Sequence, residues 1–157
     1  MRTTTTQERR RVGWRAGALV LALALPGALA FAQATPVGLW HSVDDRTGEV
    51  KGEIRIVEQG GALSGRLQRS LKKDTAADAV CEACTDDRKG RPIAGLEIIR
   101  GGRKADGQDA WEGGRILDPE NGKEYRARFT PIDGGRRLEV RGYLGPFWRT
   151  QTWTRQE

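Results

Sequence analysis

The residue types that most often carry chemistry are scarce in this sequence. Its 157 residues include one histidine, His41, and two cysteines. No serine, cysteine or acid forms a recognisable triad with His41, so the sequence offers no nucleophilic catalytic site. Two cysteines and a distant histidine also fall short of the about four ligands that a zinc site needs. We therefore predict a protein that is not an enzyme and that holds no metal or cofactor.

Long apolar runs are also missing. The run at residues 16–25 is well below the about 20 residues that a bilayer-spanning helix needs. Five arginines precede this run, and Ala32-Gln33-Ala34 follows it as a cleavage signal. This is the order of a secretory signal peptide. We expect residues 1–34 to form a signal-peptide helix used by the general secretion route, with the twin-arginine route as the alternative. Residues 35–157 would then be one periplasmic or secreted domain without a membrane span.

A strong excess of positive charge is absent once the signal peptide is set aside. The chain has 27 basic and 21 acidic residues, of which five and one precede Thr35. The remaining 22 and 20 give a net charge of about +2. No nucleic-acid partner is therefore expected.

Apolar residues at helical spacing are absent from residues 35–157. Short alternating runs bounded by turn residues recur instead, as in residues 138–143, where Leu, Val and Gly alternate with Glu, Arg and Tyr. This pattern predicts an all-β, eight-stranded antiparallel up-and-down barrel, with a two-sheet sandwich as the alternative. The expected strands are residues 37–43, 50–58, 63–71, 93–99, 111–117, 124–130, 138–143 and 147–155. The expected interior residues are Ile54, Ile56, Leu63, Leu67, Leu96, Ile98, Tyr125, Phe129, Leu138 and Val140.

The motifs of residues 35–157 resemble those of DUF2147, a family of exported bacterial proteins. The motifs, in chain order, are Gly38-Leu39-Trp40, Asp44-Asp45-Arg46-Thr47-Gly48, Cys81-Glu82-Ala83-Cys84, residues 91–95, residues 111–122, Tyr125, residues 140–145 and residues 149–153. The resemblance covers essentially the whole of this part of the chain. It implies a lipocalin-like β-barrel with no established activity.

The lipocalin-like resemblance also implies a contact at one end of the barrel. Such barrels stack a tryptophan of the first strand under an arginine of the last strand, a cation–π pair worth about 1 kcal/mol. Trp40 and Arg149 are the expected structural pair. Arg155 is the alternative partner, because a slip of two residues in the register keeps the same face.

Cys81 and Cys84 lie in the long irregular stretch at residues 72–92. An even number of cysteines in an exported chain favours a disulfide between them. A redox pair and a metal site remain as alternatives, although no helix is expected there to lower a thiol pKa. A ring this short would order a loop and would not hold the fold together.

Few other residues point to a site. Asp44 and Asp45, which precede Arg-Thr-Gly, are expected to shape a hairpin tip and not to act as an acid–base pair. The weak candidates for binding are Trp111, Arg141 and Tyr143. We expect Arg141 on the outside of the barrel, unless the register is inverted and it becomes an inward anchor for an anion.

Two functions fit this set of residues. The favoured one is non-catalytic binding of a small apolar or amphipathic ligand, which requires an open apolar interior. The alternative is an envelope protein–protein interaction module, which predicts a filled interior and an exposed apolar patch.

The Ala32-Gln33-Ala34 signal generates a first prediction. We expect the exported protein to begin at about Thr35, because small residues at these two positions are what signal peptidase recognises. Amino-terminal sequencing of the exported protein is the measurement, and an intact Met1 would contradict the prediction.

Overall fold

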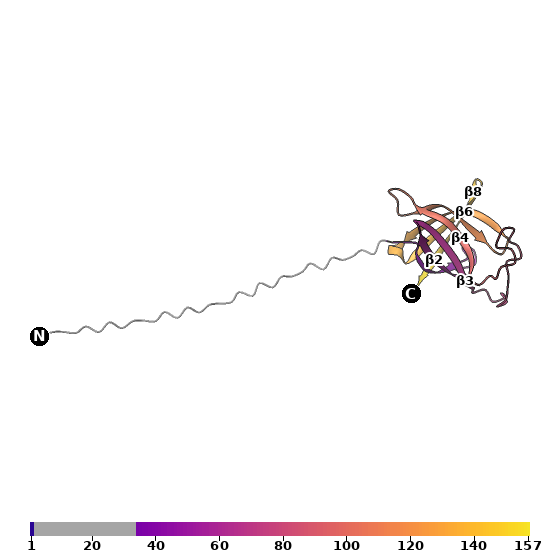
Figure 1. Cartoon of the computed structure of the whole chain (residues 1–157), viewed down its shortest axis with the longest axis horizontal. Coiled ribbons are helices and arrows are strands. Elements are labelled where there is room, and N and C mark those ends of the chain that lie inside the picture. The colour runs from indigo at the N-terminus through magenta and orange to yellow at the C-terminus, as the bar shows by residue number, and fades with distance from the viewer. Residues whose placement is uncertain (2–33) are drawn as a thin grey trace. The chain divides into compact units, whose positions relative to one another are not determined.

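The computed structural model describes Met1 and residues 34–157, and all but the two end residues of the expected signal peptide lie outside this part of the chain. The described part forms eight strands and one short 3-10 turn, η1, at Asp133–Gly135. Each strand pairs antiparallel with the next, and β1 also pairs with β8, which closes the sheet (Figure 1). The eight-stranded antiparallel up-and-down barrel is confirmed, and the sandwich alternative is excluded. The strands are β1 Gly38–Val43, β2 Val50–Gln59, β3 Ala62–Ser70, β4 Leu96–Lys104, β5 Trp111–Asp118, β6 Lys123–Ile132, β7 Arg137–Leu144 and β8 Phe147–Gln156.

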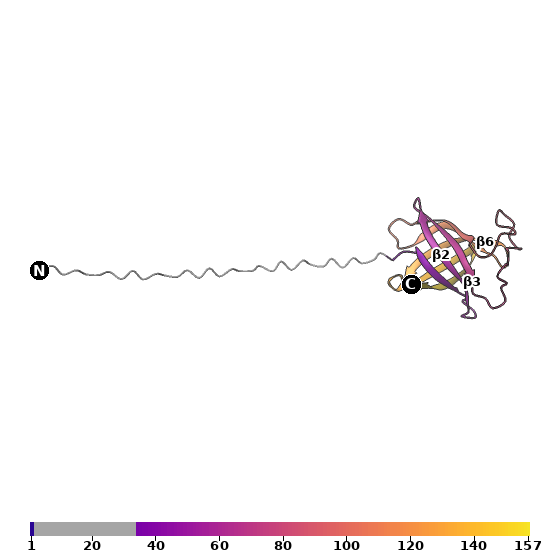
Figure 2. The ribbon, with the colours of Figure 1, turned by 60° about the horizontal axis from the view of Figure 1, so that its bottom comes forward.

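The alternation of side chains along the strands builds the interior of the barrel. In β2, Ile54 and Ile56 are buried while Arg55 between them is exposed. Nine of the ten expected interior residues are buried, and the tenth, Tyr125, is half-buried. Figure 2 shows the strands winding around the axis of the barrel. Within the described residues, no helix is both long and apolar enough to span a bilayer.

The fourth strand differs from its prediction. It was expected at residues 93–99 with a turn at Gly101-Gly102, but β4 runs from Leu96 to Lys104. Gly101 has a φ of 85°, and the register with β3 shifts there, since Leu63 faces Gly102 while Ser64 faces Arg100. The glycine therefore marks a bulge inside the strand and not its end.

The tryptophan of the first strand stacks with Arg155, so the expected pairing of Trp40 with Arg149 is wrong. The Cζ atom of Arg155 lies 4.2 Å from the centre of the wholly buried Trp40 ring. Trp40 and Arg155 are direct cross-strand partners between β1 and β8. Arg149 is six residues earlier in β8, which places it about 20 Å away along the strand.

Arg155 also ties the chain segment before β1 to the barrel. Its guanidinium donates hydrogen bonds to the carbonyl oxygens of Gly135 at 2.6 Å, Val37 at 2.8 Å and Thr35 at 2.7 Å. A Cβ atom at Gly38 would lie 2.2 Å from the Arg155 Nη1 atom, and Gly38 has a φ of 144°. The Gly-x-Trp motif therefore combines the ring that covers the arginine with the one residue type that leaves it room. We call this end of the barrel the closed end.

Double-mutant analysis tests this closure. Trp40→Ala should lower the free energy of unfolding by about 3–5 kcal/mol because it leaves a cavity the size of an indole ring. Arg155→Ala should cost about 2 kcal/mol because three partly buried carbonyl groups lose a charged donor. The two losses should not add, since the side chains share one contact. Urea unfolding is the measurement. Arg149→Ala is the control and should cost less than about 1 kcal/mol, as for exposed ion pairs; additive losses would contradict the pairing.

Candidate functional site

A cavity of about 880 Å³ opens at the end of the barrel opposite Trp40. The first hairpin, the long segment between β3 and β4, and the β5–β6 and β7–β8 turns surround its mouth. This position follows from the topology, because alternate connections of an up-and-down barrel lie at the same end. The closed end is filled by Trp40 and Arg155, so the free volume lies at the other end.

The floor of the cavity is apolar. Inward-facing side chains of five strands form it, and all five are buried: Ile54, Leu67, Ile98, Val140 and Trp153. Ser42 and Gln151 add polar groups to the wall above them. The Ser42 hydroxyl is used by a 3.3 Å hydrogen bond to the Gly52 carbonyl, and Gln151 Oε1 accepts a 3.1 Å hydrogen bond from the Trp153 indole. The amide nitrogen of Gln151 remains as a donor for a bound molecule.

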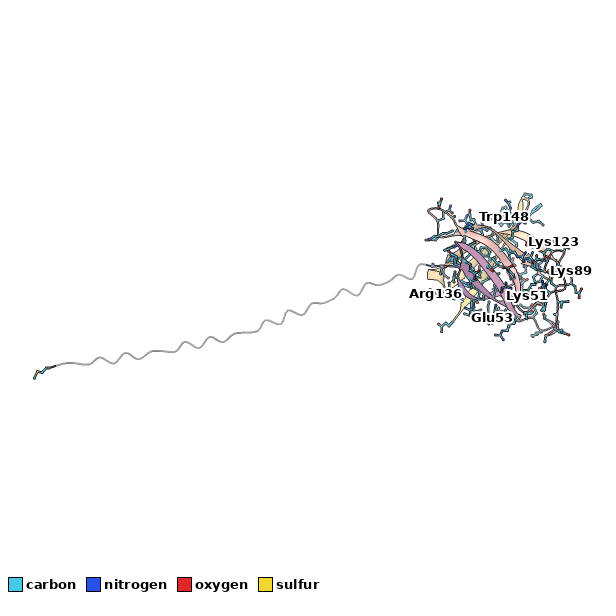
Figure 3. The ribbon with its side chains drawn as sticks, viewed as in Figure 1. Lys51, Glu53, Lys89, Lys123, Arg136 and Trp148 are labelled. Carbon is cyan, nitrogen blue, oxygen red and sulfur yellow. A yellow bond between two sulfur atoms is a disulfide. The ribbon has the colours of Figure 1, made fainter. Side chains whose placement is uncertain are left out.

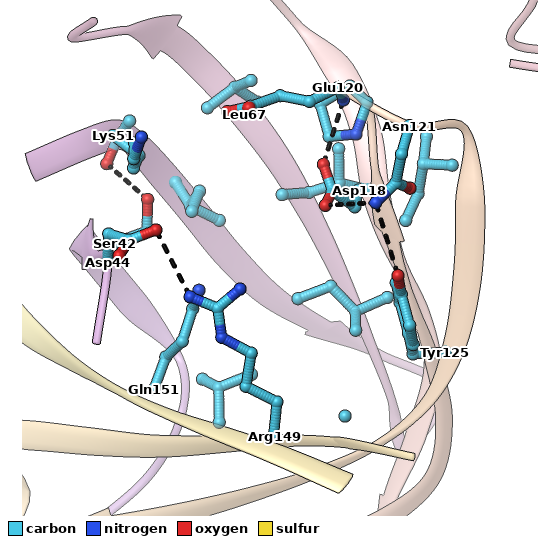
Figure 4. Close-up of a pocket in the computed structure, with 18 of the residues that line it drawn as sticks. Ser42, Asp44, Lys51, Leu67, Asp118, Glu120, Asn121, Tyr125, Arg149 and Gln151 are labelled. Atoms are coloured by element: carbon cyan, nitrogen blue, oxygen red, sulfur yellow. Dashed lines mark hydrogen bonds and ion pairs between the residues drawn. The ribbon is translucent and has the colours of Figure 1, made fainter. Parts of the chain in front are cut away.

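One side of the mouth carries an ion-pair cluster formed by Arg149, Asp44 and Asp45. Arg149 begins on the inward face of β8 and reaches to the first hairpin, where its Nη2 atom lies 3.3 Å from Asp44 Oδ2 (Figure 4). Its Nε atom lies 2.6 Å from Asp45 Oδ1. Asp44 also accepts hydrogen bonds from the amides of Arg46 at 2.9 Å and Thr47 at 3.0 Å. The expected hairpin-tip role of Asp44 is confirmed. Its side chain additionally links the hairpin to the last strand.

These contacts fix the charge of Asp44. The backbone amides of Arg46 and Thr47, and then the nearby Arg149, lower the pKa of Asp44 from 3.8 to about 2. The hydrogen bond from Arg149 likewise lowers the pKa of Asp45. Both groups are therefore carboxylates at neutral pH and are not suited to exchange protons there.

The other side of the mouth carries a hydrogen-bond network around Asn121 and a separate ion pair. Asn121 donates to Asp118 Oδ2 at 2.9 Å and to the Tyr125 hydroxyl at 3.4 Å (Figure 4). Lys72 pairs with Glu120 at 2.9 Å. Polar groups thus face each other across the opening, above the apolar floor.

The long segment between β3 and β4 forms part of the wall of the mouth and is fixed in place. Cys81 and Cys84 form the expected disulfide, with their Cα atoms 5.5 Å apart. A Cβ atom at Gly122 would lie 1.8 Å from the Ala83 carbonyl oxygen, so the disulfide loop packs directly on the β5–β6 turn. Arg88 is 3% exposed and pairs with Asp86 and with Glu124 of β6. The segment is therefore attached both to the turn and to the outside of the barrel.

The three weak binding candidates do not line this cavity. Trp111 is buried in the core, and Lys104 lies 5.4 Å from the centre of its ring. Arg141 is on the outer face of β7, as expected, and donates a 2.9 Å hydrogen bond to Thr150. Tyr143 follows on the same outer face and borders a shallow groove with Glu112. His41 is also on the outside, with its Nε2 atom 3.4 Å from Glu53.

The sequence reasoning missed Gln151 and the ion pair between Arg149 and the first hairpin. A signal for the ion pair was present, because a closed barrel of eight strands places the first hairpin and the start of the last strand at the same end. For Gln151 the alternation within β8 was the available signal, since it shares a face with Trp153.

The comparisons with known proteins give a family and a structural neighbour. A bacterial family described as uncharacterized and conserved in bacteria, DUF2147, matches residues 38–155. No curated protein matches the chain. A solved structure that is similar is protein HP1028 from the human pathogen Helicobacter pylori, described as belonging to the lipocalin family. It has a TM-score of 0.66 and 17% sequence identity, over 79% of this chain and 84% of that one.

The ion-pair cluster generates a prediction about acid stability. Because folding lowers the pKa of Asp44 from 3.8 to about 2, its contribution is complete above about pH 4 and is lost as the pH falls towards 2. Asp44→Asn should therefore reduce the loss of unfolding free energy between about pH 5 and pH 2, measured by urea unfolding. The exposed Asp106 serves as the control, and Asp106→Asn should leave this pH dependence unchanged. Equal pH dependence of the wild type and Asp44→Asn would contradict the assignment.

Proposed function

Because the chain belongs to the DUF2147 family of bacterial proteins and folds as a lipocalin-like barrel, we propose that it binds a small amphipathic molecule in the cavity at its open end, outside the cytoplasm. The observation that carries the proposal is the combination of an apolar floor and a polar mouth. A volume of about 880 Å³ lies within the range of about 300–1,000 Å³ that is usual for ligand pockets.

The arrangement of the lining residues sets the orientation of the molecule. An apolar chain or ring would lie on Ile54, Ile98 and Val140, where burial of apolar area supplies the affinity. A polar group would remain at the mouth, within reach of the Gln151 amide and the Arg149 guanidinium. The balance of acidic and basic groups around the mouth favours a polar group of low net charge.

A binding role is preferred to catalysis because of the state of the titratable groups. At the mouth, Asp44 and Asp45 are held as carboxylates by hydrogen bonds and by Arg149. His41, the residue most suited to proton transfer near neutral pH, lies on the outer wall beside Glu53. The alternative role as a protein–protein interaction module predicts a filled interior and an exposed apolar patch, and the size of the cavity argues against the first of these.

Blocking the cavity tests the proposal. Gln151→Trp places a large ring on the inward face of β8, whereas Thr152→Trp places the same ring on the outward face and is the matched control. With the neutral apolar probe N-phenyl-1-naphthylamine, we expect the dissociation constant to rise at least about tenfold for Gln151→Trp and to stay unchanged for Thr152→Trp. Probe fluorescence is the measurement, with circular dichroism to confirm folding of both variants. No binding by the wild type, or equal binding by both variants, would overturn the proposal.

A further inference from the structure

The β7–β8 hairpin carries an exposed apolar tip beside the mouth of the cavity. Its three large apolar side chains are Leu144, 50% exposed, Phe147, 76% exposed, and Trp148, 64% exposed. Among the described residues, apart from the isolated Met1, no other large apolar side chain is more than 39% exposed. Trp148 stands at the surface near β8 in Figure 3. We call these three residues the hairpin tip.

The strand register places apolar groups on both faces of this tip. Leu144 and Phe147 are cross-strand partners on the inward face and border the mouth, whereas Trp148 pairs with Tyr143 on the outward face. Gly145, with a φ of 58°, and Pro146 form the turn between the strands. The tip is therefore a narrow projection that is apolar all round, and it adds nothing to the core.

The size and form of the tip favour a lipid surface over a folded partner. Three side chains expose at most a few hundred Å², whereas a stable protein interface buries about 800 Å² on each partner. A projection also needs a matching groove in a protein, but a bilayer accepts it without one. Tryptophan in particular prefers the boundary between lipid headgroups and acyl chains.

Two arginines flank the tip and suit the phosphate groups of lipids. Arg126 is the cross-strand partner of Tyr143, which places it in one outward row with Tyr143 and Trp148. Arg46 lies on the first hairpin at the mouth. Neither arginine forms an ion pair within residues 34–157, in contrast to Arg149 and Lys72 at the same end. Guanidinium groups bind phosphate oxygens well, and every phospholipid headgroup carries them.

We propose that the hairpin tip docks the open end of the barrel onto a phospholipid bilayer. Phe147 and Trp148 insert at the headgroup boundary, and Arg46 and Arg126 contact lipid phosphates. The charged side chains around the mouth nearly balance, so electrostatic attraction contributes little to membrane binding. The insertion of the apolar hairpin tip supplies the affinity, and anionic lipid is not required. If the cavity binds an amphipathic molecule as proposed above, this orientation brings its mouth to the surface where such molecules reside.

Vesicle binding tests the docking. Residues 35–157 are suitable for the test because the closed ring of strand pairs and the core lie within them. With phosphatidylcholine vesicles, we expect the protein to cosediment and Trp148 fluorescence to shift to the blue, since the tryptophans at 40, 111 and 153 are already buried. The double variant Phe147→Ala/Trp148→Ala should lower the vesicle partition coefficient at least about tenfold. Val57→Ala, an exposed apolar residue of β2 distant from the mouth, is the control and should bind as the wild type does.

The outcomes separate this proposal from the others. No vesicle binding by the wild type, or equal binding by wild type and double variant, would overturn it. Self-association by analytical ultracentrifugation that is lost in the double variant, without vesicle binding, would assign the tip to a second copy and also overturn it. Binding of N-phenyl-1-naphthylamine by the wild type without vesicles reports on the cavity alone, so failure of the cavity proposal and failure of docking are distinguishable.

Discussion

The partly buried guanidinium of Arg155 is the constraint on which the rest of this barrel depends. It stacks on Trp40 and donates to three carbonyl oxygens, and no carboxylate pairs with it among the described residues. Partial burial lowers the pKa of Arg155, because removal of water disfavours the charged form of the guanidinium. The Arg155 side chain links β1, the segment before β1 and the turn before β7. Because these bulky groups fill one end, the interior volume is left at the other end, where the cavity opens.

Two arginines on the same face of β8 have different roles because their surroundings differ. Arg155 is partly buried between carbonyl groups and an aromatic face, so it stabilises the closed end. Arg149, six residues earlier, is at the mouth, where Asp44 and Asp45 neutralise its charge and water screens it. One strand therefore connects the part of the molecule that confers stability to the part that faces a ligand. Between these two arginines on the same face of β8, Gln151 is polar and lies nearer the mouth, whereas Trp153 is apolar and lies nearer the closed end.

The strands and the interior residues could be predicted from the sequence because alternation along a strand is a local property. The strand pattern favoured the barrel over the sandwich, and the family resemblance added a lipocalin-like form and a Trp–Arg contact. The arginine of that contact could not be predicted, because the pairing of first and last strands depends on closure across the whole chain. The end of β4 was misplaced because Gly101 reads as a turn in sequence and forms a bulge in the structure. The mouth was hardest to predict, since Arg149 and Asp44 meet across more than a hundred residues. Only the three-dimensional order of the turns brings them together.

The disulfide between Cys81 and Cys84 has a consequence for where this protein takes its final form. The bond closes a ring with a sequence separation of three, so it contributes little to the stability of the barrel. It does shape the loop that packs on Gly122, beside the β5–β6 turn that borders the opening. In a reducing compartment the eight strands would still pair, but the loop at residues 81–84 would lack its disulfide. Oxidation of the two thiols therefore braces the loop that supports the β5–β6 turn, and the redox state of the compartment decides whether this brace is present.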